Sequence, residues 1–296
     1  MEKLKFKKNS TIVDKIIDDI TEDSNLKRFF MKHDITTETI ENHLNDLITY
    51  QQEHPRCLEC EGLDHCTQDT LGHQPVLNYL NDAIRLSYQP CNYLRHHERT
   101  QNVKNRINAL YMPHMIYNAK LADFYMQSPE RKALYKEIMA FMKKVKLGEP
   151  TKGFYLCGEY QIGKTYTLAA MANHLAELNK SVVIAYYPDL TREIKSSIRT
   201  GELENIISNL KNVDVLMLDD IGGESPSQWV RDEVLGPILQ HRLLDQKITC
   251  FTSNVPLKEL PKFMIENAQQ AEKVKAYRIG ERIKHLTDEY RMTETK

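Results

Sequence analysis

Residues 158–165 read GEYQIGKT, which is a glycine, four variable residues and a Gly-Lys-Thr triplet. The apolar segment GFYLC precedes them, and the amphipathic segment TYTLAAMANHLAELNK begins at Thr165. A strand, a glycine-rich loop and a helix in this order form a cradle for phosphate oxygens, because the loop amides and the helix N-terminus point at the anion. This stretch therefore predicts an α/β domain built around a nucleotide.

Each residue type in the loop has a role in such a cradle. Gly158 and Gly163 let the backbone turn tightly around the phosphates. Lys164 would reach the β- and γ-phosphates, and the Thr165 hydroxyl would be a ligand of Mg²⁺. The alternative is an accidental match on a surface loop, and the flanking strand and helix argue against it.

Short apolar segments alternate with helical segments from Gly153 onward: GFYLC, SVVIAYY, DVLMLDD and ITCFTSN. Such alternation is typical of a parallel sheet with crossover helices. The third segment ends in Asp219 and Asp220, and the carboxyl ends of parallel strands meet at one edge of the sheet. We expect Asp219 to hold magnesium and Asp220 to orient or deprotonate an attacking water. The alternative is an ordinary strand end with solvated acids.

Two later motifs extend this site. The segment ITCFTSN would deliver Asn254 to the same sheet edge, near the γ-phosphate or the water, and a simple turn is the alternative. Arg278 and Arg282 are four residues apart and share a helix face. Supplied by a neighbouring subunit, such an arginine stabilises the charge of a transition state. The alternative is a solvated face paired with nearby glutamates.

The first third of the chain holds a cysteine- and histidine-rich segment. Cys57 and Cys60 have the spacing of a metal-binding knuckle, and Cys66, His73 and Cys91 follow. Zinc needs four donors, so this set is larger than required. Free thiols in a small helical domain are the alternative.

Charge restricts how the chain can bind nucleic acid. Lys and Arg number 40 against 41 Asp and Glu, so the formal net charge is −1 and binding requires a local basic patch. Arg192, Lys195 and Arg199 recur at three- and four-residue spacing. They would contact phosphates without reading sequence, and a solvated helix face is the alternative.

Composition also indicates the compartment. No signal peptide and no apolar run of bilayer-spanning length is recognisable, which predicts a cytoplasmic protein. In a reducing compartment the cysteines would bind metal or fill the core rather than form disulfides. Cys157 and Cys250 lie in apolar segments, and we expect them to be buried in the core.

Five motifs follow one another in the order GEYQIGKT, LMLDDIGGES, WVRDEVLGPILQHRL, TCFTSN and AYRIGERI. This order resembles the DnaA/DnaC-type AAA+ ATPases and, within them, the DnaI/DnaC-type replicative helicase loaders, above all those of low-GC Gram-positive bacteria. The resemblance covers about residues 130–290. It extends more loosely over the N-terminal third, because that family also carries a Cys/His module there.

The resemblance implies an α/β fold, with an AAA+ P-loop ATPase that has a parallel sheet and a small helical C-terminal lid. A small, mostly helical zinc-binding domain would precede it. We expect the N-terminal domain over residues 1–105, a linker over 106–130 and the AAA+ domain over 131–296.

The function implied by the resemblance is the ATP-dependent loading of the hexameric replicative DNA helicase onto single-stranded DNA, during initiation or restart of replication. The N-terminal domain would contact the helicase. The AAA+ domain would bind ATP, Mg²⁺ and DNA, and it would self-associate on the helicase.

The resemblance also assigns roles to residues. Lys164 and Thr165 match the Walker A pair, Asp219 and Asp220 match Walker B, and Asn254 matches sensor 1. Arg278 and Arg282 match the box of the arginine finger, and the segment with Arg192, Lys195 and Arg199 matches a helix pair associated with single-stranded DNA. The implied zinc ligands are Cys57, Cys60, His73 and Cys91, with Cys66 as a competing ligand.

One departure from the family concerns the last residues. Relatives carry a Gly-x-x-x-Arg stretch with the sensor-2 arginine well beyond the Glu-Arg-Ile triplet, where this sequence reads LTDEYRMTETK. We therefore expect weak ATP hydrolysis without partners. Two rival functions remain open: a transposition-helper ATPase of the same clade, against which the cysteine module argues, and an ATP-binding adaptor with little hydrolysis.

Overall fold

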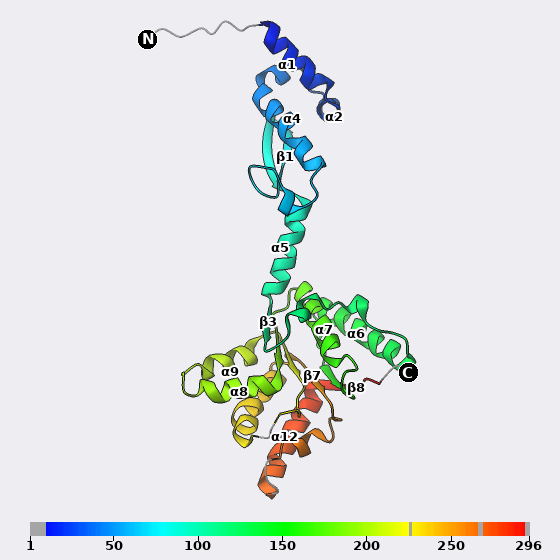
Figure 1. The fold of residues 1–296 in the computed structure, drawn as a ribbon, viewed down its shortest axis with the longest axis vertical. Helices are drawn as coiled ribbons and strands as arrows, with labels where there is room; N and C mark the ends of the chain where they lie inside the picture. The colour runs from blue at the N-terminus through cyan, green and yellow to red at the C-terminus, as the bar shows by residue number, and fades with distance from the viewer. Residues whose placement is uncertain (1–9, 225–226, 266–268, 294–296) are drawn as a thin grey trace. The chain divides into compact units, whose positions relative to one another are not determined.

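The computed structural model describes residues 10–224, 227–265 and 269–293, and the chain divides into two compact units (Figure 1). The first unit is Met1–Thr100 and the second is Gln101–Lys296. The outer ends of the predicted domains, residues 1–9 and 294–296, lie outside the described residues. None of the helices in the described ranges is long and apolar enough to cross a membrane.

The first unit combines helices with an antiparallel hairpin. Its elements are α1 (Ser10–Glu22), α2 (Ser24–His33), α3 (Thr37–Asn42), α4 (Leu44–Leu58), the 3-10 turn η1 (Leu63–His65), β1 (His73–Leu80) and β2 (Ala83–Pro90), and α5 (Asn92–Asn105) follows. Ile20, Leu26, Leu47 and Ile84 are fully buried between these elements. Their burial joins the helices to the hairpin in one small core.

The prediction of a mostly helical N-terminal domain missed this hairpin. Asn81 and Asp82 connect the two strands, and both have left-handed backbones, with φ of 51° and 54°. Asparagine and aspartate tolerate this conformation, and a two-residue turn of this kind matches the twist of paired strands. The Asn81-Asp82 pair is therefore a hairpin signal that the sequence itself contains.

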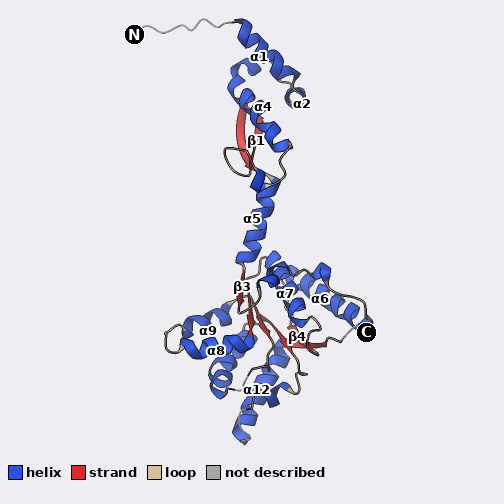
Figure 2. Cartoon of the chain, in the orientation of Figure 1, coloured by secondary structure: helices blue, strands red, loops and turns tan. Residues whose placement is uncertain are grey.

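The second unit is built on a parallel sheet, as predicted (Figure 2). In the described residues the strand order is β3-β5-β6-β7-β4-β8. The strands are β3 (Ile107–Leu110), β4 (Gly153–Cys157), β5 (Val182–Tyr186), β6 (Val215–Asp219), β7 (Ile248–Ser253) and β8 (Thr287–Arg291). All four predicted strands are present, and β3 and β8 were not foreseen.

Helices cover both faces of the sheet. They are α6 (Pro129–Leu147), α7 (Lys164–Glu177), α8 (Tyr187–Ser197), α9 (Leu203–Asn212), the π-helix η4 (Val230–Leu235), α10 (Gly236–Leu244), α11 (Leu260–Phe263) and α12 (Gln270–Leu286). Alternate strand residues enter different cores: Leu156 packs with α6 and α7, whereas Tyr155 packs with α8, α10 and α12. Cys157 and Cys250 are buried in these cores, as expected.

The segment 106–130 is part of this unit. Strand β3 pairs with β5 in register Ile107↔Val182, and the 3-10 turns η2 (His114–Asn118) and η3 (Leu121–Asp123) follow it. Ile116 and Leu121 are buried in the core that α7 covers. Within the segment that was expected to form a linker, residues 107–110 therefore complete an edge of the sheet.

The predicted small helical lid at the C-terminus stays a prediction, and the C-terminal helix α12 of the described residues packs on the sheet. Ala276, Ile279 and Ile283 of α12 are buried in the same core as the sheet residues. The chain then continues into β8, which pairs in parallel with β4. The apolar side chains of α12 recur at three- and four-residue spacing, so they form one stripe that packs on the domain.

A fully buried arginine, Arg242, forms hydrogen bonds near the starts of strands β6 and β7. Arg242 of α10 donates hydrogen bonds to the carbonyls of Leu210, Val213 and Ile248 and to the Thr249 hydroxyl. Burial lowers the pKa of Arg242 to about 10, so the side chain stays charged at neutral pH. Its hydrogen bonds to backbone carbonyls therefore join the end of α9 to the start of β7.

Candidate nucleotide site

The GEYQIGKT loop connects β4 to α7, in the strand–loop–helix context that the sequence predicted. A Cβ on Gly158 would lie 2.3 Å from the Met292 carbonyl oxygen, so only glycine fits there. Gly163 has a φ of 92°, a conformation that other residues rarely adopt. Both glycines are thus required by the local geometry.

Lys164 is the first residue of α7 and is 8 % exposed. Its Nζ donates hydrogen bonds to the carbonyls of Gly158 at 2.9 Å and Glu159 at 2.6 Å, and to Asn254 Oδ1 at 2.8 Å. Burial lowers the pKa of Lys164, while Asp220 and Asp219 act in the opposite direction. The loop therefore surrounds the Lys164 ammonium group, and all three of its hydrogen-bond acceptors are neutral groups.

Asp219 ends strand β6 and is 3 % exposed. It accepts hydrogen bonds from the Thr165 hydroxyl at 2.9 and 3.0 Å and from the Thr252 hydroxyl at 2.6 Å. Burial raises the pKa of Asp219, although these two hydrogen bonds lower it. Hydroxyl and carboxylate oxygens are the ligands that Mg²⁺ prefers, and here they converge.

Asp220 follows with a left-handed backbone, at a φ of 62°. Its amide donates to Thr252 Oγ1 at 2.8 Å, and its carboxylate accepts from Asn254 Nδ2 at 2.8 Å. Tyr186 pairs in register with Asp219 at the end of β5, so it lies beside the two acidic residues. Burial first, and then the charges of the nearby aspartates, raise the pKa of Tyr186.

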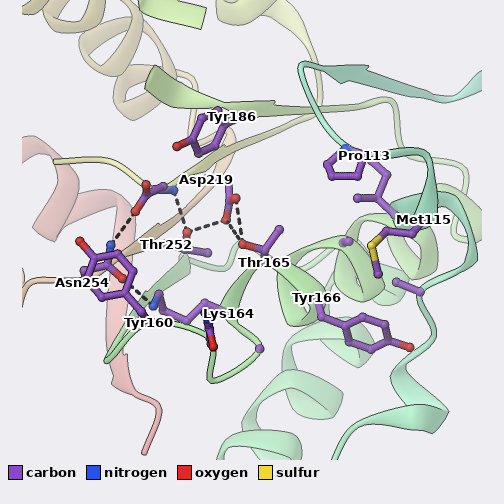
Figure 3. A pocket seen from close by; sticks show the side chains of 16 residues that line it. Pro113, Met115, Tyr160, Lys164, Thr165, Tyr166, Tyr186, Asp219, Thr252 and Asn254 are labelled. Atoms are coloured by element: carbon purple, nitrogen blue, oxygen red, sulfur yellow. Dashed lines mark hydrogen bonds between the residues drawn. The ribbon is translucent and has the colours of Figure 1, made fainter. Parts of the chain in front are cut away.

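These side chains line a cavity of about 580 Å³ (Figure 3). Its polar side contains Lys164, Thr165, Asp219, Asp220 and Asn254, and apolar residues from 113–119 and the later α7 residues Tyr166 and Ala169 also line it. In the figure, Thr165, Asp219 and Thr252 form one hydrogen-bonded chain between Tyr186 and Lys164. The predicted Walker and sensor residues are thus brought together at the carboxyl edge of the sheet.

A second cavity, of about 460 Å³, adjoins the same loop. Gln161, Gly163 and Tyr166 line both cavities. The second one is otherwise lined by η3, the start of α6 and α7 residues, including Phe124, Tyr125 and Arg131. The phosphate-binding loop therefore has free volume on two sides.

Arg278 and Arg282 do not line the 580 Å³ cavity of this chain. Both lie on α12, where they border a groove with Val274 and Tyr277. Arg282 Nε donates to Gln240 Oε1 at 3.0 Å, and Arg278 is exposed. The structure therefore does not bring this pair together with the Walker residues of its own chain.

The predicted basic stripe is only partly helical. Arg192 and Lys195 are exposed on α8, and Arg192 pairs with Asp189 one turn earlier. Arg199 lies beyond the end of α8, in the turn before α9. Two of the three residues thus share a helix face.

The four cysteines of the predicted zinc site lie near one another in the first unit, because the charges of the other three act on Cys57. Burial, followed by the charges of Cys66, Cys60 and Cys91, raises the pKa of Cys57, although a hydrogen bond from Gln68 lowers it. As the side chains stand, no group of three or more His, Cys, Asp or Glu residues in the described ranges could hold a metal ion. Zinc binding therefore stays a prediction.

Cys66 and His73, the two competing zinc ligands, each take part in one hydrogen bond. The Gly72 amide donates to Cys66 Sγ at 3.4 Å, and His73 Nδ1 lies 3.1 Å from the Leu71 carbonyl oxygen. A histidine whose Nδ1 is tied to a carbonyl has Nε2 free as a ligand. Neither bond decides between Cys66 and His73.

Comparison with known proteins finds similar proteins over most of the chain. The family model "Primosomal protein DnaI N-terminus" matches residues 1–88, and "IstB-like ATP binding protein" matches residues 81–287. The replicative helicase loader DnaI of Bacillus subtilis (strain 168) is 33 % identical over 276 residues, which are 92 % of this chain and 89 % of that protein. The chain belongs to the DnaI family of replicative helicase loaders.

Solved structures agree with the DnaI assignment. A DnaI crystal structure matches with a TM-score of 0.57 and 37 % identity, and covers 66 % of this chain and 98 % of that one. The DnaC helicase loader matches with a TM-score of 0.50 and 20 % identity over 61 % of this chain and 100 % of that one, which shows the shared fold. The DnaI family thus accounts for both units.

The motifs missed two residues of this site. Thr252 lies inside the quoted segment TCFTSN, yet only Asn254 was assigned a role, although Thr252 bonds both acidic residues. Tyr186 ends the predicted strand SVVIAYY, and its place beside Asp219 depends on strand order. A polar residue at the end of each parallel strand was the signal that could have found both.

We predict that Asp219→Asn leaves the nucleotide-free protein at least as stable as the wild type at pH 7. Burial raises the pKa of Asp219, so its ionised form destabilises the fold above that raised pKa, and the neutral amide lacks this charge. As the pH falls through the raised pKa, the wild-type carboxyl gains a proton and the difference should shrink. Melting temperatures measured between about pH 4 and pH 7 would show this trend.

Asp214→Asn is the matched control. Burial alone would raise the pKa of Asp214, but hydrogen bonds from the Ser181 amide and hydroxyl, with Lys180 and Lys247 nearby, lower it. Its charge therefore stabilises the fold at neutral pH, and the amide should lower the melting temperature there, with a loss that fades as the pH falls. An Asp219→Asn protein that melts below the wild type at pH 7 would contradict the prediction.

Proposed function

We propose that this chain is an ATP-dependent loader that places the replicative DNA helicase on single-stranded DNA during initiation or restart of replication. The observation that carries the proposal is the double match, to the DnaI N-terminus over residues 1–88 and to an ATP-binding protein over residues 81–287. The ATP-binding match alone would fit a transposition helper equally well. The N-terminal match favours the loader.

ATP and Mg²⁺ fit the residues of the 580 Å³ cavity. The amides of the GEYQIGKT loop and Lys164 would hold the phosphates, and Thr165 and Asp219 would hold the magnesium, through water in the case of Asp219. Bound magnesium supplies the charge that offsets the phosphate oxygens. The raised pKa of Asp219 supports this assignment, because a buried carboxylate gains from a nearby cation.

Asp220 would orient or deprotonate the attacking water, and Asn254 would sense the γ-phosphate. Their 2.8 Å hydrogen bond supports a joint role. Arg278 and Arg282 of a neighbouring copy would complete the site, since neither lines the cavity in its own chain. The chain would therefore act as a self-associated cytoplasmic assembly on the helicase.

We predict that Lys164→Ala abolishes ATP binding and helicase loading, whereas Asp220→Asn retains ATP binding and loses hydrolysis by roughly a hundredfold or more. Lys164 provides the cation for the phosphates, and Asp220 provides the base for the water. ATP binding, phosphate release and loading of the cognate helicase onto circular single-stranded DNA would be measured in parallel. Equal loading by Asp220→Asn and the wild type would favour the adaptor.

The same assay tests the contribution of a neighbouring copy. Arg278→Ala should bind ATP and hydrolyse it slowly, and mixing it with Lys164→Ala should restore part of the activity, because the latter keeps Arg278. No recovery on mixing would argue against an arginine that acts between copies. Copurification with a transposase and no replicative helicase would support the transposition rival.

Arg192, Lys195 and Arg199 are the proposed contacts to single-stranded DNA. The exposure of all three side chains supports binding to a phosphate backbone. Replacing both Arg192 and Lys195 by alanine should weaken binding to an oligonucleotide and reduce its salt dependence by about 0.7 per lost phosphate contact. Fluorescence anisotropy over a salt series measures both effects.

The control for that pair is Lys143 with Lys146, an exposed basic pair at the same three-residue spacing on α6. Its replacement by alanine removes the same charge from a different surface. If both double variants lose binding equally, the α8 surface has no special role.

We also propose that the first unit holds one structural zinc through Cys57, Cys60, His73 and Cys91. The influence of Cys60 and Cys91 on Cys57 supports three of these donors, and the bond between His73 Nδ1 and the Leu71 carbonyl leaves the His73 Nε2 free to be the fourth. His73→Ala should lose zinc and Cys66→Ser should keep it, as measured by metal analysis of the purified chains. The reverse result would make Cys66 the fourth ligand, and zinc-free wild type would indicate free thiols.

A further inference from the structure

The phosphate-binding loop is contacted by a buried arginine that none of the motifs contains. Arg131 lies in the first turn of α6 and is 7 % exposed. Its Nη2 donates to the Ile162 carbonyl at 2.6 Å, and its Nε donates to the Thr293 carbonyl at 3.4 Å. Among the described residues, no carboxylate forms an ion pair with it. Its charge is therefore directed at the loop backbone.

The hydrogen bond to the Ile162 carbonyl orients the peptide group between Ile162 and Gly163. The described residues contain no cis peptide bond, and in a trans peptide the C=O and the following N–H point in opposite directions. Holding the Ile162 carbonyl against Arg131 therefore turns the Gly163 N–H to the other side of the loop. Gly163 caps α7, and amides at such a helix start are the ones that bind anions.

The contact with Thr293 joins the loop to the C-terminal segment. The Met292 amide donates to the Cys157 carbonyl at 2.7 Å, so backbone pairing continues past β8 to the beginning of the loop. The Met292 carbonyl packs closely on Gly158. Residues 292 and 293 thus contact the start of the loop directly and its end through Arg131.

Arg131 itself is held in place by aromatic rings. Its guanidinium lies 5.9 Å from the ring centre of Phe124 and 6.0 Å from that of Tyr125, within the range of cation–π attraction. The Ser128 hydroxyl accepts a hydrogen bond from the Arg131 amide, which fixes the start of α6. The side chain is therefore oriented before any ligand arrives.

We propose that Arg131 is a positioning residue of the nucleotide site, which holds the phosphate-binding loop in its anion-binding conformation and links it to residues 292–293. This inference rests on the proposed binding of ATP by the loop. Arg131 lines the second cavity and not the one that contains Asp219 and Asp220, so it acts on the loop and not on the attacking water.

The test compares Arg131→Gln, Arg131→Lys and Lys164→Ala in the full chain. We expect Arg131→Gln to weaken binding of a fluorescent ATP analogue with Mg²⁺ by roughly tenfold to a hundredfold, the range for a lost charged hydrogen bond. The KM for ATP should rise with little change in kcat. Arg131→Lys keeps the charge and can still donate to one of the two carbonyls, so it should recover part of the affinity.

Arg242→Lys is the matched control, because Arg242 is also buried and also donates to backbone carbonyls, but far from the loop in the fold. It should lower the melting temperature without changing the KM for ATP. A purely structural Arg131 would behave in the same way, and that result would overturn the proposal.

The remaining outcomes distinguish a failure of the Arg131 role from a failure of the proposed ATP binding. If Lys164→Ala abolishes nucleotide binding and Arg131→Gln binds within about twofold of the wild type, only the role of Arg131 is refuted. If Lys164→Ala leaves nucleotide binding unchanged, the proposed function fails, and the role of Arg131 fails with it.

Discussion

The arrangement of the nucleotide site depends on one buried carboxylate. Asp219 at the end of β6 accepts hydrogen bonds from Thr165 on α7 and from Thr252 on β7, so three elements meet at its oxygens. A buried charge is unfavourable unless it is hydrogen-bonded or paired, and the raised pKa indicates that two hydroxyls do not fully offset the loss of water. The fold thus retains an acid that it does not need for its own stability, as expected of a cation ligand.

Local patterns predicted the centre of the sheet and the site on its edge. The alternation of apolar segments identified the four strands that carry the loop, Asp219 and Asn254, because buried parallel strands are short apolar runs. The Gly-Lys-Thr triplet and the paired acids then followed from their chemistry. What these residues share is that each lies at a strand end, which can be read without knowing the strand order.

The edges of the sheet could not be predicted in the same way. Strand β3 has four residues in a polar neighbourhood, and β8 reads TDEYR, in which only Thr287 is buried. Neither has the apolar run of a central strand, because an edge strand has one neighbour and is partly solvated. Tyr186 was missed for a related reason, since its position beside Asp219 follows from the pairing of β5 with β6.

In the described structure Lys164 and Asp220 are joined through one side-chain amide, that of Asn254. Asn254 accepts from Lys164 with its Oδ1 and donates to Asp220 with its Nδ2, so its two ends contact the two functional groups of the site. A phosphate that binds Lys164 competes with the Asn254 oxygen and with two loop carbonyls for the same Nζ protons. In the proposed function, a change in that competition would reach Asp220 through the planar amide of Asn254. The sheet edge that places Asn254 between β4 and β6 would then couple phosphate binding to the orientation of Asp220 without requiring a movement of the domain.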